Sequence, residues 1–212
     1  LHYPLRRQRQ MCIRDRRCYS ELVTGTGEQK KKPMIFAVEE PELYMHPQAQ
    51  RNIRKVFRGI ADKDDQVLFS THSSLLLDVA YFDEVIRVES VQEEVEGTNT
   101  VKSKVWQLPM QAMIEDLKAR HGVDATDDSM RELYSHAYHP NRSEGFFAKS
   151  IILVEGPTEQ YSLPIYADTS GHPLDSLNIS VVDSGGKGSM DRLYRIFNEL
   201  GIPCFMLFDY DK

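Results

Sequence analysis

Short apolar runs, each ending in polar residues, dominate the first part of the chain. The runs over residues 34–38 and 67–69 are typical of buried parallel strands. Between them, Pro47 stands where a helix can begin, and apolar residues then recur at helical spacing. The pattern therefore predicts a strand, an amphipathic helix over residues 47–61, and a second strand.

The pattern changes in the middle of the chain. Residues 85–88 and 101–106 are predicted to form strands that can pair, joined by an acidic loop that contains Gly, Thr and Asn. A helix is expected over residues 110–120. Residues 121–145 are polar and show no clear period, which indicates an irregular segment and a domain boundary.

A second series of strands and helices follows. Strands are predicted at residues 151–154, 179–182 and 204–208, with helices between them that end near Ala167 and Leu200. Strands that alternate with helices imply a parallel sheet with right-handed crossovers. The predicted fold class is therefore α/β.

Composition narrows the class of protein. Of the 212 residues, 41% are hydrophobic and 27% are charged, as in globular proteins. No run reaches the roughly 18 apolar residues of a membrane-spanning helix, and no signal-peptide pattern is present. The three cysteines form no CxxC pair. We therefore expect a cytoplasmic protein that does not contact a membrane.

The net charge of −6 hides an uneven distribution. Residues 1–33 carry nine Lys and Arg against three Asp and Glu, whereas the rest of the chain is acidic. This basic leader shows neither helical nor strand periodicity. It is either a basic arm for DNA phosphates or a segment foreign to the fold, and we prefer the second interpretation.

Two glutamates end the first predicted strand, and a histidine follows the second. Because parallel sheets bind ligands at the carboxyl ends of their strands, Glu39, Glu40 and His72 would share one edge. One carboxylate there can hold Mg²⁺ bound to nucleotide phosphates, and the next can orient or deprotonate an attacking water. The histidine can hydrogen-bond a γ-phosphate. Two acids after a strand can also simply solvate a loop.

Acidic residues also end strands in the second series. Glu155 ends one strand and Glu159 begins the next helix, while Asp209 and Asp211 follow the last strand. If these strands are neighbours, four carboxylates converge and repel one another. A divalent cation relieves the repulsion, and oxygen ligands suit Mg²⁺ or Mn²⁺. Each motif alone is common in turns, so the hypothesis rests on their combination.

A glycine-rich turn lies between these acidic motifs. Gly185 and Gly186 allow the backbone to approach a ligand closely, and Lys187 can meet a phosphate of DNA. Asp183 is either a further metal ligand or an aspartate that stabilises the turn or caps the helix.

The first motifs resemble a known class of ATPase. FAVEEPELYMHPQAQ, followed by LFSTHSSLLLD, resembles the ATP-binding-cassette ATPases of the SMC, RecF and OLD (overcoming lysogenization defect) type. The resemblance implies that Glu39 is the Walker B metal ligand, Glu40 the catalytic base and His72 the switch histidine. Residues 43–47, which include His46, would form the D-loop at a dimer contact. No GxxxxGK[ST] motif is present, so we expect the C-terminal half of such a domain and negligible ATP hydrolysis by this chain alone.

The later motifs resemble a second class. SIILVEGPTEQYSLPIYA, VVDSGGKGSM and CFMLFDYDK resemble successive strand ends of the Rossmann-like Toprim domain. The order of the two domains resembles the OLD family of ATP-dependent endonucleases. The resemblance implies that Glu155, Glu159, Asp209 and Asp211 are metal ligands, with Asp183 as a further candidate. It also makes Glu155 the candidate general base.

The resemblance to the OLD family implies a function for the intact parent protein. That function is Mg²⁺- or Mn²⁺-dependent hydrolysis of DNA, controlled by an ATP-binding domain and suited to anti-phage defence. DNA and ATP would be ligands, the ATPase domain would form a homodimer or higher oligomer, and a helicase is a further candidate partner. The alternatives are a DNA-associated ATPase–Toprim protein that only binds, or another Toprim enzyme of primase or topoisomerase type.

The same resemblance divides the chain into four parts. We expect the leader over residues 1–33, the C-terminal part of an ATPase domain over 34–120, a linker over 121–148 and the N-terminal part of a Toprim domain over 149–212. Both domains would be incomplete, and this chain alone would be inactive.

Overall fold

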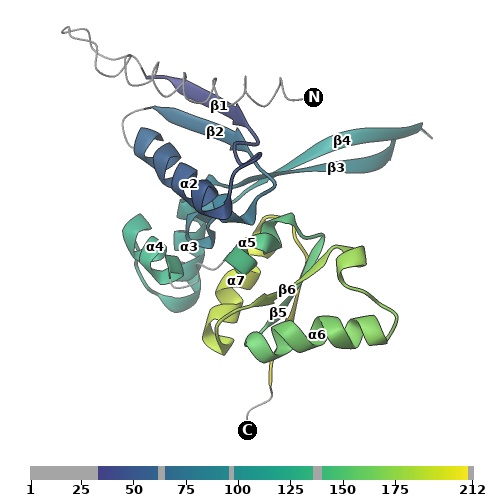
Figure 1. Cartoon of the computed structure of the whole chain (residues 1–212). Helices are drawn as coiled ribbons and strands as arrows, with labels where there is room; N and C mark the ends of the chain where they lie inside the picture. The colour runs from purple at the N-terminus through teal and green to yellow at the C-terminus, as the bar shows by residue number, and fades with distance from the viewer. Residues whose placement is uncertain (1–32, 62–64, 96–97, 136–139, 210–212) are drawn as a thin grey trace, which may run out of the picture.

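The computed structural model describes residues 33–61, 65–95, 98–135 and 140–209 (Figure 1). Its α-helices are α2 (Pro47–Ala61), α3 (Met110–His121), α4 (Asp127–Ser135), α5 (Pro140–Glu144), α6 (Pro157–Thr169) and α7 (Lys187–Glu199). Its strands are β1 (Ile35–Glu39), β2 (Gln66–Ser70), β3 (Ile86–Val95), β4 (Thr98–Gln107), β5 (Ser150–Val154), β6 (Ile179–Asp183) and β7 (Cys204–Leu207). Short 3-10 turns are η1 (Ser74–Leu76), η2 (Val79–Glu84), η3 (Gly145–Phe147) and η4 (Asp175–Leu177). The α/β class is confirmed.

The first unit consists of β1 and β2, paired in parallel, with α2 against them. The rings of Phe57 on α2 and Phe69 on β2 lie 5.3 Å apart, which shows the face that the helix covers. The predicted helix and both predicted strands are confirmed. Their predicted burial is wrong for the other face, where Ile35 is 72% and Leu68 58% exposed. Within the described residues this sheet has two strands and a helix on one side, so half of each strand meets solvent.

β3 and β4 form a long antiparallel hairpin that projects from the body of the molecule (Figure 1). The predicted pair of strands is confirmed, but much of the predicted acidic loop continues the two strands. The ribbon is exposed, so glutamates can point into water without cost, and threonine favours extended backbone. At the base of the hairpin, Arg87 donates to the carbonyls of Leu200 and Gly201, each at 3.3 Å.

The segment predicted to be irregular contains two helices, α4 and α5, so that prediction is wrong. Met130 and Tyr134 on α4 are spaced four residues apart, and both are buried. At the start of α4, the Thr126 backbone amide donates to the Ser129 hydroxyl at 2.8 Å, and the Ser129 amide donates to the Thr126 hydroxyl at 3.3 Å. This reciprocal capping explains why so polar a segment begins a helix.

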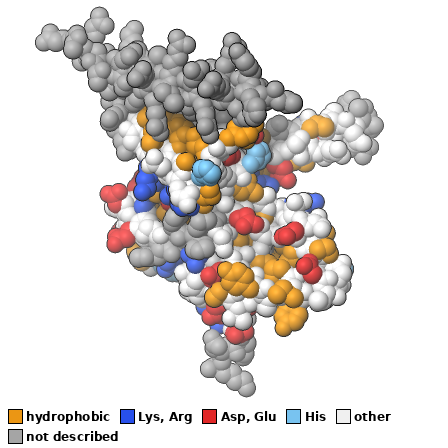
Figure 2. All heavy atoms as spheres, in the orientation of Figure 1, with side chains coloured by type: hydrophobic (Ala, Val, Ile, Leu, Met, Phe, Trp, Pro, Cys, Tyr) orange, Lys and Arg blue, Asp and Glu red, His pale blue; other side chains and the backbone are white. Residues whose placement is uncertain are grey.

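The second unit is a parallel sheet in the order β6-β5-β7, with β5 in the centre. At its carboxyl edge, Val154 on β5 pairs with Asp183 on β6 and with Leu207 on β7. The predicted strands and the parallel sheet are therefore confirmed. Helix α6 follows β5, and α7 follows β6. In the view of Figure 2, hydrophobic side chains gather at the surface of the lower part of the molecule.

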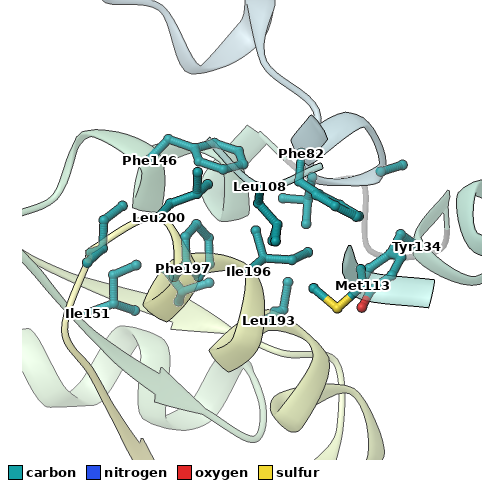
Figure 3. Close-up of a cluster of buried hydrophobic side chains, with 14 of the residues drawn as sticks. Phe82, Leu108, Met113, Tyr134, Phe146, Ile151, Leu193, Ile196, Phe197 and Leu200 are labelled. Atoms are coloured by element: carbon teal, nitrogen blue, oxygen red, sulfur yellow. The ribbon is translucent and has the colours of Figure 1, made fainter. Parts of the chain in front are cut away.

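One hydrophobic core joins η2, the base of the hairpin, the helices α3 and α4 and the second unit (Figure 3). The Phe82 ring of η2 lies 5.5 Å from the Tyr134 ring of α4, and the Phe146 ring of η3 lies 5.2 Å from the Phe197 ring of α7. The segment predicted to be a linker thus packs between the flanking elements. Within the described residues, no helix has both the length and the apolar character needed to cross a membrane.

Candidate functional site

The carboxyl edge of β1 and β2 carries three of the residues predicted for nucleotide chemistry. Glu39, the last residue of β1, pairs with Ser70, and the Glu40 amide donates to the Ser70 carbonyl at 3.0 Å. Glu40 has a φ of 42°, so the chain turns sharply there. His72 Nε2 lies 3.7 Å from Glu40 Oε1. The structure therefore brings Glu40 and His72 together, as the shared edge predicted.

Glu42 is a residue of this edge that our sequence reasoning did not assign. Its Oε1 accepts a hydrogen bond from the His72 backbone amide at 2.7 Å. This hydrogen bond connects the segment after β2 to the turn after β1, and it therefore helps to fix the position of His72. In the predicted D-loop, Leu43, Tyr44 and His46 are exposed. An exposed D-loop agrees with a surface that can meet a partner.

The carboxyl edge of β6-β5-β7 carries the residues predicted to bind metal. Glu155 directly follows the central strand β5, and Glu159 lies in the first turn of α6, where a negative charge suits the helix dipole. Asp209 lies two residues beyond the end of β7. Since β7 pairs with β5, all three reach the same edge of the sheet. Asp211 lies outside the described residues.

Convergence of these acids into a metal site stays a prediction. In the part of the chain that the structure describes, no group of three or more His, Cys, Asp and Glu side chains is placed to hold a metal ion. The donor chemistry suits Mg²⁺ or Mn²⁺, because carboxylate oxygens are the ligands that these ions prefer. The described acids alone, however, do not form the cluster that the four-carboxylate hypothesis requires.

Asp183 stabilises the turn that follows β6. Its Oδ1 accepts a hydrogen bond from the Gly185 amide at 2.6 Å, which is the role of an aspartate in a turn. Arg142 on α5 supports the same residue, because its Nε donates to the Asp183 carbonyl at 2.7 Å. Sequence reasoning missed Arg142, which lies in the predicted linker, since a contact between residues so far apart leaves no local pattern.

The two glycines of this turn differ in their surroundings. Gly185 has a φ of +74°, and a Cβ atom there would lie 2.6 Å from Arg142 Nη2. The group that approaches Gly185 closely in this structure is therefore an arginine of this chain, and the approach of a ligand to this turn stays a prediction. Gly186 has open space at the Cβ position, and its amide donates to the Glu155 carbonyl at 2.8 Å. Lys187 Nζ donates to the Asp209 carbonyl at 3.0 Å.

We expect Gly185→Ala to lower the free energy of unfolding by about 2 kcal/mol, because the new Cβ adds strain at positive φ and displaces Arg142. Urea denaturation followed by circular dichroism measures the change. Gly188→Ala is the matched control, since Gly188 lies in α7 with open space around it. It should leave stability unchanged or raise it by up to about 1 kcal/mol. Equal stability of the two variants would contradict the role given to Arg142.

Two family models match the chain, one at each edge. The AAA ATPase domain model matches residues 11–77, which include Glu39, Glu40 and His72. The match begins inside the basic leader that we expected to be foreign to the fold. The model of the Toprim domain of overcoming-lysogenization-defect-like proteins matches residues 146–211, which include the four predicted metal ligands.

Relatives with known names cover most of the chain. The Old nuclease of Escherichia phage P2 is 28% identical over 91% of this chain, and the OLD nuclease of Thermus scotoductus is 29% identical over 82%. The chain is therefore similar to OLD nucleases over most of its own length. The chain is also 25% identical, over 85% of its length, to Endonuclease GajA of Bacillus cereus. It spans 30%, 30% and 26% of the length of these three relatives.

Proposed function

We propose that this chain carries the metal-binding edge of a DNA endonuclease that is controlled by ATP. The observation that carries the proposal is the carboxyl edge of β6-β5-β7, where Glu155 follows β5, Glu159 lies in the first turn of α6 and Asp209 lies beyond β7. This edge lies inside the segment that matches an OLD-like Toprim domain. The named relatives that cover the chain are nucleases, which supports the same activity.

The proposed reaction is hydrolysis of a phosphodiester bond in DNA. Glu155, Glu159, Asp209 and Asp211 would hold one or two Mg²⁺ or Mn²⁺ ions, which would lower the pKa of a bound water and neutralise charge on the phosphate. Glu155 would accept a proton from the attacking water. The hydrogen bonds from Gly186 to the Glu155 carbonyl and from Lys187 to the Asp209 carbonyl hold these two segments in place.

The edge of β1 and β2 would bind ATP with Mg²⁺. Glu39 would hold the metal, Glu40 would orient the attacking water and His72 would contact the γ-phosphate. The 3.7 Å separation of His72 and Glu40 supports this pairing. ATP binding would control the access of DNA, through an oligomer that uses the exposed loop over residues 43–47. A cytoplasmic role in anti-phage defence, with a helicase as partner, completes the proposal.

A plasmid assay tests the activity, using the chain extended to the full length of its relatives. Mg²⁺ or Mn²⁺ should convert supercoiled plasmid to nicked and linear forms, EDTA should stop the conversion, and added Mn²⁺ should restore it. The alternative is a protein that binds DNA without cleaving it. Binding of plasmid without cleavage at every metal concentration would support the alternative and overturn the proposal.

A further inference from the structure

A cavity of about 420 Å³ lies beside the metal-binding edge and has no role in the proposed function. α4 and α5 form one side, through Tyr134 and Arg142, and α7 forms another, through Arg192. Ser184 and Gly185, in the turn after β6, complete the lining next to the edge. The cavity is therefore built where the segment predicted to be a linker meets the Toprim part.

The charges of the cavity favour an anion. Arg142 and Arg192 line it, against one acid, Glu132. Arg192 makes no side-chain hydrogen bond or ion pair with any residue that the structure describes. Arg195, one turn further along α7, is by contrast paired with Asp116 and Asp191. A guanidinium that faces a cavity without a carboxylate partner is suited to bind an anion.

A tyrosine hydroxyl adds a hydrogen-bond donor to the cavity. Tyr134 is only 3% exposed, yet within the described residues its hydroxyl has no hydrogen-bond partner. Burial raises the pKa of this phenol to about 12, so the hydroxyl stays protonated and can donate. Ser189 in the first turn of α7 lines the same cavity with a second hydroxyl. Both hydroxyls can therefore donate to the oxygens of a ligand in the cavity.

The turn after β6 fixes the cavity next to the metal-binding edge. The Ser184 amide donates to the Val154 carbonyl at 2.9 Å, and the Gly186 amide donates to the Glu155 carbonyl at 2.8 Å. Ser184 and Gly185 thus border the cavity while the same turn is bonded to the end of β5. A nucleic-acid strand that places one phosphate at Glu155 can extend a neighbouring phosphate toward this cavity.

We propose that this cavity binds a phosphate group of the DNA strand, adjacent to the phosphate that is cleaved. Arg192 would pair with the phosphate charge, and the hydroxyls of Tyr134 and Ser189 would donate to its oxygens. The proposal rests on the proposed function, since it takes DNA as the substrate of the neighbouring edge. It adds a second, metal-independent point of attachment that fixes the position of the strand.

Fluorescence anisotropy with a labelled duplex oligonucleotide tests the cavity, using this chain in EDTA over a range of NaCl concentrations. Arg192→Gln should weaken binding about tenfold and reduce the slope of log affinity against log salt by about 0.9, because one phosphate contact is lost. Tyr134→Phe should weaken binding about threefold with an unchanged slope, because it removes a neutral donor. Glu132→Gln should strengthen binding.

Arg120→Gln is the matched control, because it removes the same charge from α3 outside the cavity. It should leave the affinity and the slope close to those of the unaltered chain. Unchanged affinity and slope in both Arg192→Gln and Tyr134→Phe would overturn the proposal, while metal-dependent plasmid cleavage would still support the proposed function. A further outcome is that inorganic phosphate, titrated by calorimetry, binds the unaltered chain and not Arg192→Gln. If the affinity for the oligonucleotide is then the same in both proteins, the cavity binds free phosphate and the DNA proposal fails. A chain that neither binds nor, when extended, cleaves DNA overturns both proposals.

Discussion

Glu155→Gln should reduce metal-dependent plasmid cleavage by at least about 100-fold in the chain extended to the length of its relatives. Glu155 follows the central strand of β6-β5-β7, so it lies between the segments that carry Asp183 and Asp209. The substitution keeps the size of the side chain but removes the charge that would bind metal and accept a proton. Loss of a positioned acid or base costs about 10²–10⁴-fold in rate.

Two comparisons separate this loss from a general effect of lost charge. Glu199→Gln removes a carboxylate from the exposed C-terminal end of α7, and it should leave cleavage within twofold of the unaltered protein. The affinity of Glu155→Gln for duplex DNA in EDTA should also stay the same or rise, because an acid is removed near the phosphates. Full cleavage by Glu155→Gln would show that the edge of β5 is not the catalytic site.

Local patterns were sufficient to predict most of the strands and helices that carry the sites. The apolar runs before Glu39 and Glu155 end in acids, and parallel pairing of neighbouring strands then requires these acids to share an edge with later strand ends. α2 was predicted with the bounds that the structure shows, because its apolar spacing is regular and Pro47 marks its start. These features depend on residues close together in sequence.

Features that depend on distant residues were missed. Arg142 occupies the space that a side chain at position 185 would need, so this position requires glycine. The two residues lie far apart in the chain and share no periodic pattern. α4 was missed because only Met130 and Tyr134 of its surface are buried, too few to produce a clear apolar stripe. The capping pair at Thr126 and Ser129 was the available signal.

Phe197→Ala should lower the free energy of unfolding by about 3–5 kcal/mol, because it removes a large buried side chain. Phe197 is fully buried on α7, and its ring packs against Phe146 from the predicted linker. A Cβ atom at Gly145 would lie 2.8 Å from this ring, so the space around it is filled and a smaller side chain would leave a cavity. Circular dichroism in urea measures the loss.

Fluorescence of the single tryptophan tests whether the hairpin and the β6-β5-β7 unit unfold together. Trp106 lies at the base of the β3–β4 hairpin, and its ring fills the space where a Cβ atom at Gly201 would lie. Its fluorescence therefore reports the junction between the hairpin and the turn after α7. Because one core connects η2, α4 and α7, Phe197→Ala should shift the fluorescence and circular dichroism midpoints together. Tyr161→Ala, at an exposed position on α6, should shift neither by more than about 0.5 kcal/mol. A fluorescence midpoint that stays in place while the circular dichroism midpoint falls would mean that the predicted linker separates two independently folding domains.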